Sequence, residues 1–210
     1  MAFLNYSCVG TNYIPTIKPT IVNLFDTVKI KNDFIAARNL KADCIIVVVH
    51  WGIEHKLHES EDQNLQAEFL ARQGADIILG MHPHVVQPIS QIEVMKYDGT
   101  LHKALVAYSL GNFISNHHLP NTQGGIMLYT KLIRQTKKDK AILEASSYIP
   151  VWRHIYKDSY GKKVFTLLPI PQYQKFPEKY MILNESSLKE MEEFSDGLKK
   201  RLEFPVWFPD

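Results

Sequence analysis

Two apolar runs separated by one capped helix constrain the fold of this chain more than any other feature. Residues 43–49 and 76–79 are short and rich in β-branched side chains, which is typical of strands buried on both faces of a parallel sheet. Between them, Ser60 and Gln63 predict a capping box at the start of a helix, and Gly74 predicts its C-terminal cap. The pattern predicts a βαβ unit in which both strands run in the same direction.

Histidines follow both predicted strands. His50 ends the first run, and we expect Gly80 to end the second. Pro83 then predicts that His82 and His84 are held on a rigid, extended turn. Parallel strands end at the same edge of a sheet, and neighbouring strands lie about 4.8 Å apart. We therefore expect His50, His82 and His84 to converge on one metal, and neutral imidazoles suit zinc, manganese, iron or nickel.

Two polar residues are further candidates for this site. Glu54 lies on the loop after His50, where it is either a solvated carboxylate or a group that orients an imidazole or accepts a proton. Asn112 lies in a Gly-Asn turn, which its tolerance of left-handed backbone is enough to explain, although its amide could also point into the site. Four other histidines are expected to be structural or exposed, namely His102, His117, His118 and His154.

The rest of the chain predicts a mixture of strands and helices. We expect strands over residues 2–6, 89–97, 101–110, 124–133, 141–151 and 164–170, with a hairpin turn at Asp98-Gly99. We expect helices from an Asp26 N-cap to residue 40 and over 186–202 after a Ser187–Glu190 capping box, and an extended loop over 169–177. The helix between the apolar runs should bury Leu65, Ala67, Phe69, Leu70 and Ala71. The expected organisation is an α/β domain over 1–210, with 134–210 as a C-terminal strand and helix extension.

Composition excludes several classes of protein. The 210 residues are 45% hydrophobic and 22% charged, which is ordinary for a globular domain, and no apolar run reaches the length of a membrane span. A net charge of +2 gives no reason to expect a nucleic-acid partner. Two cysteines make no disulfide framework, and no signal peptide precedes the first strand, so the sequence alone leaves localisation unknown.

Three motifs carry a family resemblance. They are His50-Trp51-Gly52-x-Glu54, then Gly74-Ala75-Asp76-Ile77-Ile78-x-Gly80-x-His82-Pro83-His84-Val85-x-Gln87-Pro88, and then Tyr108-Ser109-Leu110-Gly111-Asn112-Phe113. Together they resemble the capsule-synthesis proteins of the poly-γ-glutamate type, the CapA family. That family resembles the calcineurin-like metallophosphoesterases, which implies an α/β/β/α sandwich with a dinuclear metal site. The resemblance implies that His50 and His82 share one metal and that His84 serves the other.

The resemblance also implies what this chain lacks. Metallophosphoesterases supply Asp-x-His, bridging Asp and Asn-His ligands from strands that come before the position of His50, and none of these motifs occurs in the 49 residues that precede His50 here. We therefore expect the C-terminal part of such a domain, without its first strands, and one divalent metal (manganese, zinc or iron) rather than two. The implied function is capsule polymer biosynthesis, with hydrolysis of a phosphate ester or a γ-glutamyl polymer. The alternative is a non-catalytic assembly subunit or an inactive remnant.

The resemblance further implies an anionic substrate, small or polymeric, and contact with the capsule-synthesis machinery at the cell envelope or membrane. A homo-oligomer is also expected, because a sandwich without its first strands leaves apolar faces and sheet edges uncovered.

Overall fold

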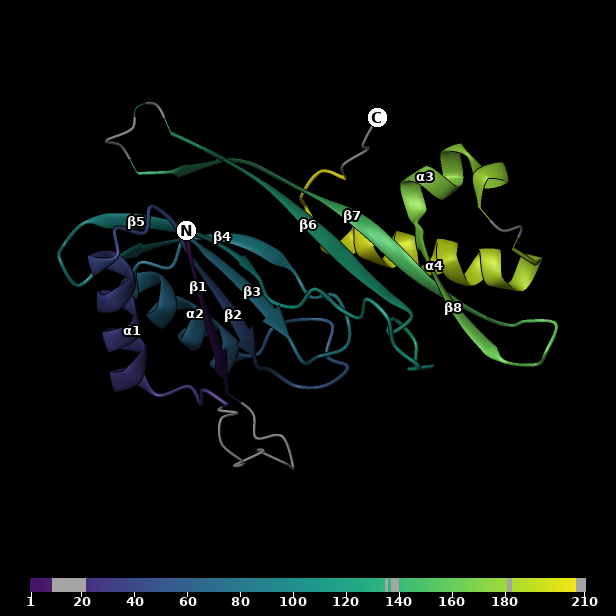
Figure 1. The fold of residues 1–210 in the computed structure, drawn as a ribbon, viewed down its shortest axis with the longest axis horizontal. Coiled ribbons are helices and arrows are strands. Elements are labelled where there is room, and N and C mark those ends of the chain that lie inside the picture. The colour runs from purple at the N-terminus through teal and green to yellow at the C-terminus, as the bar shows by residue number, and fades with distance from the viewer. Residues whose placement is uncertain (9–21, 135, 137–139, 181–182, 207–210) are drawn as a thin grey trace.

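The computed structural model describes residues 1–8, 22–134, 136, 140–180 and 183–206, and it confirms the predicted α/β class (Figure 1). A five-stranded sheet has the order β1-β2-β3-β5-β4, and a three-stranded sheet has the order β6-β7-β8. The strands of the larger sheet are β1 (Ala2–Ser7), β2 (Ile45–His50), β3 (Ile77–Met81), β4 (Ile89–Met95) and β5 (Leu101–Ala107). Those of the smaller sheet are β6 (Gly124–Ile133), β7 (Ile142–Lys157) and β8 (Lys163–Pro169). The helices are α1 (Thr27–Asn39), α2 (Glu61–Gln73), α3 (Ile170–Lys175) and α4 (Glu185–Arg201), with a 3₁₀ turn at Pro177–Lys179.

The predicted βαβ unit is confirmed. β1, β2 and β3 are parallel neighbours, and β5 continues the parallel order before the antiparallel β4. Helix α2 begins with the expected capping box, in which Ser60 and Gln63 bond to each other's backbone amides, and it ends at Gly74 in the left-handed conformation. Asp26 caps α1 by accepting from the backbone amide of Lys29. Local sequence signals therefore set the ends of both helices that cover the sheet.

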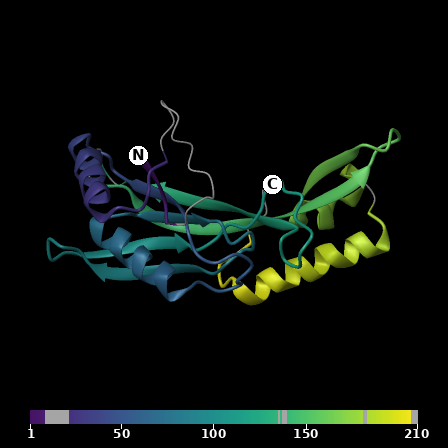
Figure 2. The same cartoon turned by 90° about the horizontal axis from the view of Figure 1, so that it is seen from below.

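The two faces of the five-stranded sheet pack against different layers. Val47 and Ile78 point to the face that α1 and α2 cover, whereas Ile46 and Ile77 point to the face that the second sheet covers. That second core also contains Trp152 of β7 and the apolar side of α4. Figure 1 shows β6 and β7 crossing the five-stranded sheet and continuing beyond it, and Figure 2 shows α4 lying along their far part. Helices α1 and α2 thus cover one face of the five-stranded sheet, and the core on its other face includes residues of the second sheet and of α4.

Gly80 corrects one expectation. The strand does not stop there but continues through it to Met81. A Cβ at Gly80 would overlap the backbone carbonyl of Tyr108 and the indole nitrogen of Trp51, which donates a hydrogen bond to that carbonyl at 2.8 Å. Glycine is required because two buried groups approach the strand closely, and not because the strand must end.

Three further expectations were wrong. Leu65 is 60% exposed, because the buried side of α2 includes the polar Gln63 in its place. Residues predicted as an extended loop over 169–177 form α3 and the start of the 3₁₀ turn, since Pro171 lies in the first turn of α3, where its missing amide costs nothing. Helix α4 is capped by Asn184 rather than by a Ser187–Glu190 box.

The ends of the second sheet show how the C-terminal part is attached. β6 ends just before residue 134, where the extension was expected to begin, and it pairs with β7, which follows that residue. The apolar residues 204–209 predict a tail that packs back onto the body. Val206 forms a β-bridge with Tyr148, while residues 207–209 lie outside the described part. None of the helices in the described part of the chain is long and apolar enough to cross a membrane.

Candidate metal centre

Two histidines lie together at the carboxyl edge of the parallel strands. His50 is the last residue of β2 and pairs with Met81, the last residue of β3, so that His82 comes directly after the neighbouring strand end. The centroids of the His50 and His82 rings are 4.5 Å apart, with the rings at 64° to each other. The hydroxyl oxygen of Ser7, at the end of β1, lies 3.5 Å from Nδ1 of His50. The parallel register thus brings both imidazoles to one place.

His84 is held by Asn112. Nδ2 of Asn112 donates to the backbone carbonyl of Thr122 at 3.0 Å, which leaves Oδ1 of the same amide as an acceptor. Nδ1 of His84 lies 2.9 Å from that Oδ1 and therefore donates to it. In a neutral imidazole this tautomer leaves the lone pair on Nε2, which is the form that binds a metal. The amide of Asn112 thus points into the site and orients a candidate ligand.

Two histidines that we did not assign to the site complete a histidine cluster of His50, His55, His82, His84 and His117. The ring of His117 stacks on His84 with centroids 4.3 Å apart, although we expected His117 to be structural or exposed. His55 lies 6.1 Å from His84 and 6.2 Å from His117, again between ring centroids. The His82 and His84 centroids are 6.3 Å apart. The cluster therefore has two close pairs, linked by the turn that carries His82 and His84.

Strained backbone accompanies the cluster. His55, His82 and His84 have φ angles of +62°, +104° and +60°, so the expectation of an extended turn at Pro83 was wrong. Residues other than glycine rarely adopt such φ angles. Each such residue costs roughly 1–3 kcal/mol of strain, and strained residues of this kind are frequent at functional sites. The backbone amide of His55 donates to the carbonyl of Pro83 at 2.8 Å, which ties the two strained turns together.

A buried glutamine, Gln87, holds the loop that carries His55. Gln87 is fully buried, and its Nε2 donates to the backbone carbonyls of Lys56 and His58, both at 2.9 Å. Its Oε1 accepts from Nε2 of the equally buried Gln63 at 2.9 Å. The position of the loop that carries Glu54 and His55 thus depends on hydrogen bonds that no sequence pattern indicated.

Burial and mutual repulsion favour neutral imidazoles. Burial lowers the pKa of His50, and the neighbouring His82 and His84 lower it further. Burial also lowers the pKa of His82 and of His117, with contributions from His84 and His55. The exposed carboxylate of Glu54 opposes both shifts, which places its charge near His82 and His117. A site whose histidines are neutral has lone pairs to offer to a cation.

Neutral imidazoles are suitable ligands for a divalent cation, but the rings of the cluster do not form a coordination shell as they stand. Among the described residues, no three His, Cys, Asp or Glu side chains are placed so that they could hold a metal ion as they stand. Zinc requires imidazole nitrogens at about 2.0–2.1 Å, so rotation of side chains would have to bring them together. The ring centroids of His50 and His82 are 4.5 Å apart, and Glu54 is a carboxylate that acts electrostatically on His82.

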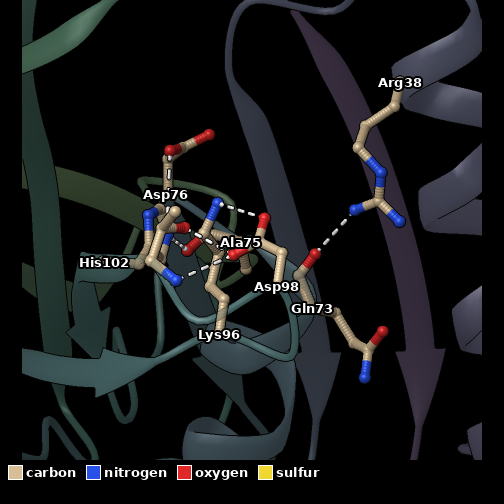
Figure 3. Close-up of polar contacts among 8 residues, drawn as sticks. Arg38, Gln73, Ala75, Asp76, Lys96, Asp98 and His102 are labelled. Carbon is tan, nitrogen blue, oxygen red and sulfur yellow. Dashed lines mark hydrogen bonds and ion pairs between the residues drawn. The ribbon is translucent and has the colours of Figure 1, made fainter.

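A separate cavity of about 320 Å³ lies at the opposite, amino edge of the same sheet. Figure 3 shows its polar groups, which already bond to one another. The contacts are Asp76 with the Ile45 amide at 2.7 Å, His102 with the Ala75 carbonyl at 2.8 Å, Arg38 with the Gln73 carbonyl at 2.8 Å and Lys96 with Asp98 at 3.3 Å. These groups join strand starts and turns, and they lie at the opposite edge of the sheet from the histidine cluster, so we do not assign the metal centre to this edge.

Comparisons with known proteins find two relatives that are named for capsule biosynthesis. The chain is 38% identical over 87 residues to the PGA biosynthesis protein CapA of Bacillus subtilis (strain 168), which covers 41% of this chain and 20% of that protein. It is 30% identical over 131 residues to the capsule biosynthesis protein CapA of Bacillus anthracis, covering 56% of this chain and 30% of that protein. The matches thus span less than a third of the length of these relatives.

A family model matches residues 6–117, just over half of the chain, and this stretch contains all five members of the histidine cluster as well as Glu54 and Asn112. The chain belongs to the family of the bacterial capsule synthesis protein PGA_cap.

Proposed function

We propose that this chain takes part in the biosynthesis of a capsule polymer of the poly-γ-glutamate type, as a divalent-metal-dependent hydrolase of a phosphate ester or a γ-glutamyl bond. One observation carries the proposal. His50 and His82 end neighbouring parallel strands with their rings 4.5 Å apart, at the sheet edge where α/β folds bind ligands. Membership in a capsule-synthesis family supports the biological context.

Each residue of the cluster has a distinct part in this proposal. His50 and His82 would hold the metal, with His84 as a further ligand that Asn112 orients through its 2.9 Å hydrogen bond. A divalent metal there would supply Lewis-acid polarisation of a phosphoryl or carbonyl oxygen. Glu54 would accept a proton, since its carboxylate is exposed and acts electrostatically on His82 and His117.

We further propose that the substrate is anionic and that the chain works with the capsule-synthesis machinery at the cell envelope, as the relatives named for capsule biosynthesis suggest. The non-catalytic alternative is favoured by one observation, namely that no three candidate ligands in the described part of the chain are ready to hold a metal. A direct measurement of metal binding and turnover separates the two.

The test titrates zinc and manganese into the wild type and into four variants, His82→Ala, His84→Ala, Asn112→Ala and His102→Asn, by calorimetry. The wild type and the His102→Asn variant should each bind one metal, because His102 lies at the opposite edge of the sheet. Asn112→Ala, which removes the partner of His84, should weaken binding by about 10–100-fold. His82→Ala and His84→Ala should weaken it more.

A chromogenic phosphate diester and a γ-glutamyl peptide are assayed in parallel. Turnover that disappears in His82→Ala and Glu54→Gln supports the hydrolase. Metal binding without turnover of either substrate would put the non-catalytic assembly subunit first. Equal metal affinity in His82→Ala and His102→Asn would remove the metal centre altogether.

A further inference from the structure

A pocket of about 400 Å³ lies beside the C-terminal part of β7, outside the stretch that the family model matches. Three parts of the chain form its walls: the loop before β6, the C-terminal part of β7 and the first turns of α4. The lining residues are His118, Gln123, Trp152, Arg153, His154, Ile155, Ser187 and Glu190. Neither the candidate metal centre nor the proposed reaction uses this pocket.

The sheet topology explains why a pocket exists here. β6 begins at Gly124, which pairs with Trp152, whereas β7 continues to Lys157. Beyond Trp152, β7 therefore has β8 on one side and no β6 residue on the other. The backbone amide of Arg153 donates instead to the carbonyl of Gln123 at 2.7 Å. Trp152 and Arg153 leave opposite faces of β7, because successive residues of a strand alternate, and both line the pocket at this open strand edge.

Two residues of the pocket wall have buried donors without an acceptor in the described part of the chain. Trp152 is only 2% exposed and Arg153 only 4% exposed, and neither the indole Nε1 nor the guanidinium Nε has a hydrogen-bond partner among the described residues. Both groups can only donate, and a buried donor without an acceptor is destabilising. They are neighbours in sequence and line the same cavity, and one of them carries a positive charge. A ligand that satisfies both must offer acceptors and, preferably, negative charge.

We infer that this pocket binds an oxyanion, a carboxylate or a phosphate group, between the guanidinium of Arg153 and the indole of Trp152. Arginine suits this role because its planar guanidinium remains charged when buried and matches such groups in shape. The walls also carry the buried imidazole of His154, the exposed imidazole of His118 and the exposed carboxylate of Glu190. Glu190 is the group that opposes anion binding.

Arg153 connects this pocket to the histidine cluster, since its Nη2 donates to the backbone carbonyl of His117. An acidic ligand in the pocket would thus lie next to the loop that carries a member of the cluster. The inference rests on the proposed function only for its biological meaning, which is that the bound oxyanion is an acidic group of the same substrate. The binding itself requires no metal and is tested without one.

The experiment follows the indole N–H signals of ¹⁵N-labelled protein by NMR. The chain has three tryptophans, and a Trp152→Phe variant assigns the relevant signal. Inorganic phosphate and acetate are titrated in a chelator at constant ionic strength. The Trp152 signal should shift saturably with one or both anions, and the better binder identifies the oxyanion. The Trp51 signal should remain in place, because that indole already donates to the carbonyl of Tyr108.

Matched variants make the test specific. Arg153→Gln should weaken anion binding by about 10-fold or more, since it removes a charged donor. Glu190→Gln, at an exposed position, should strengthen binding by roughly 2–5-fold because it removes the opposing charge. Arg134→Gln, at an exposed arginine paired with Asp43, should bind like the wild type.

His82→Ala should also bind the anion like the wild type, which separates this result from the failure of the metal centre. No saturable shift of the Trp152 signal, or an equal shift of the Trp51 signal, would overturn the inference. So would unchanged affinity in both Arg153→Gln and Glu190→Gln. If Arg153→Gln does not fold, Glu190→Gln alone decides, and binding no tighter than in the wild type counts against the site.

Discussion

Replacing Gln87 with glutamate should destabilise the protein far more than its small change in shape suggests. The wild-type amide donates to the carbonyls of Lys56 and His58 and accepts from Gln63, each at 2.9 Å. The introduced carboxylate keeps the acceptor but loses both donors, and it places an oxygen against two carbonyl oxygens. Each buried group that loses its partner costs about 1–3 kcal/mol. Because the two carbonyls belong to an exposed loop that water can partly reach, we expect a total of about 2–4 kcal/mol.

Thermal unfolding measures this loss. For a chain of this length, 1 kcal/mol corresponds to about 2–4 °C, so the Tm should fall by roughly 5–15 °C. Gln91→Glu, at an exposed position on β4, makes the same chemical change without those bonds and should shift the Tm by about 1 °C or less. A Tm for Gln87→Glu equal to that of Gln91→Glu would refute the reasoning.

The effect of Gln87→Glu should also depend on pH. Burial and two facing carbonyls raise the folded-state pKa of the introduced carboxyl above its unfolded value. Its protonated form can still donate one hydrogen bond, so the stability present at low pH is lost as the pH rises through the folded-state pKa. The difference from the wild type should therefore be larger at pH 8 than at pH 5 in urea unfolding. A difference that shrinks as the pH rises would contradict this assignment of the bonds.

Two further predictions concern packing and titration. Gly80→Ala would drive a Cβ into the Tyr108 carbonyl and the Trp51 indole, so it should lower the free energy of unfolding by about 3 kcal/mol or more in urea. In Gly99→Ala the new Cβ meets no described atom within 4 Å, and only the φ of +80° is unfavourable, so the loss should be about 1–2 kcal/mol. The pKa values of His50, His82 and His117 are lowered in the folded state, so unfolding takes up protons and the free energy of unfolding should fall as the pH drops below about 6.5. His82→Asn should flatten that slope in the presence of a chelator, and an unchanged slope would exclude the cluster as its source.

The sequence predicted the fold well where the local pattern and the burial agree. Ile30, Phe34 and Ala37 have helical spacing and are the buried residues of α1. For α2 the predicted burial of Ala67, Leu70 and Ala71 is confirmed, but Leu65 is exposed and Gln63 is fully buried. A periodicity of apolar residues cannot indicate a glutamine that is buried because another buried glutamine accepts its hydrogen bond.

The candidate site was predictable only as far as strand ends determine it. The parallel strands place His50 and His82 together, and the sequence order of strand, helix and strand is enough to indicate that arrangement. His55 and His117 reach the cluster through loops whose paths depend on left-handed backbone and on long-range bonds. Such loops have no periodic pattern, and a signal for His117 would have required knowledge that its loop returns to the same edge of the sheet.

The positive φ angles of His55, His82 and His84 also imply a conflict between the stability of the fold and the binding of a metal. Glycine at position 55, 82 or 84 would relieve backbone strain of roughly 1–3 kcal/mol at each site. Laboratory evolution for heat resistance alone should therefore remove these imidazoles among its first substitutions, while evolution for metal binding should retain them. A few substitutions to glycine in the loops after β2 and β3 should therefore give a more stable protein that lacks these imidazoles.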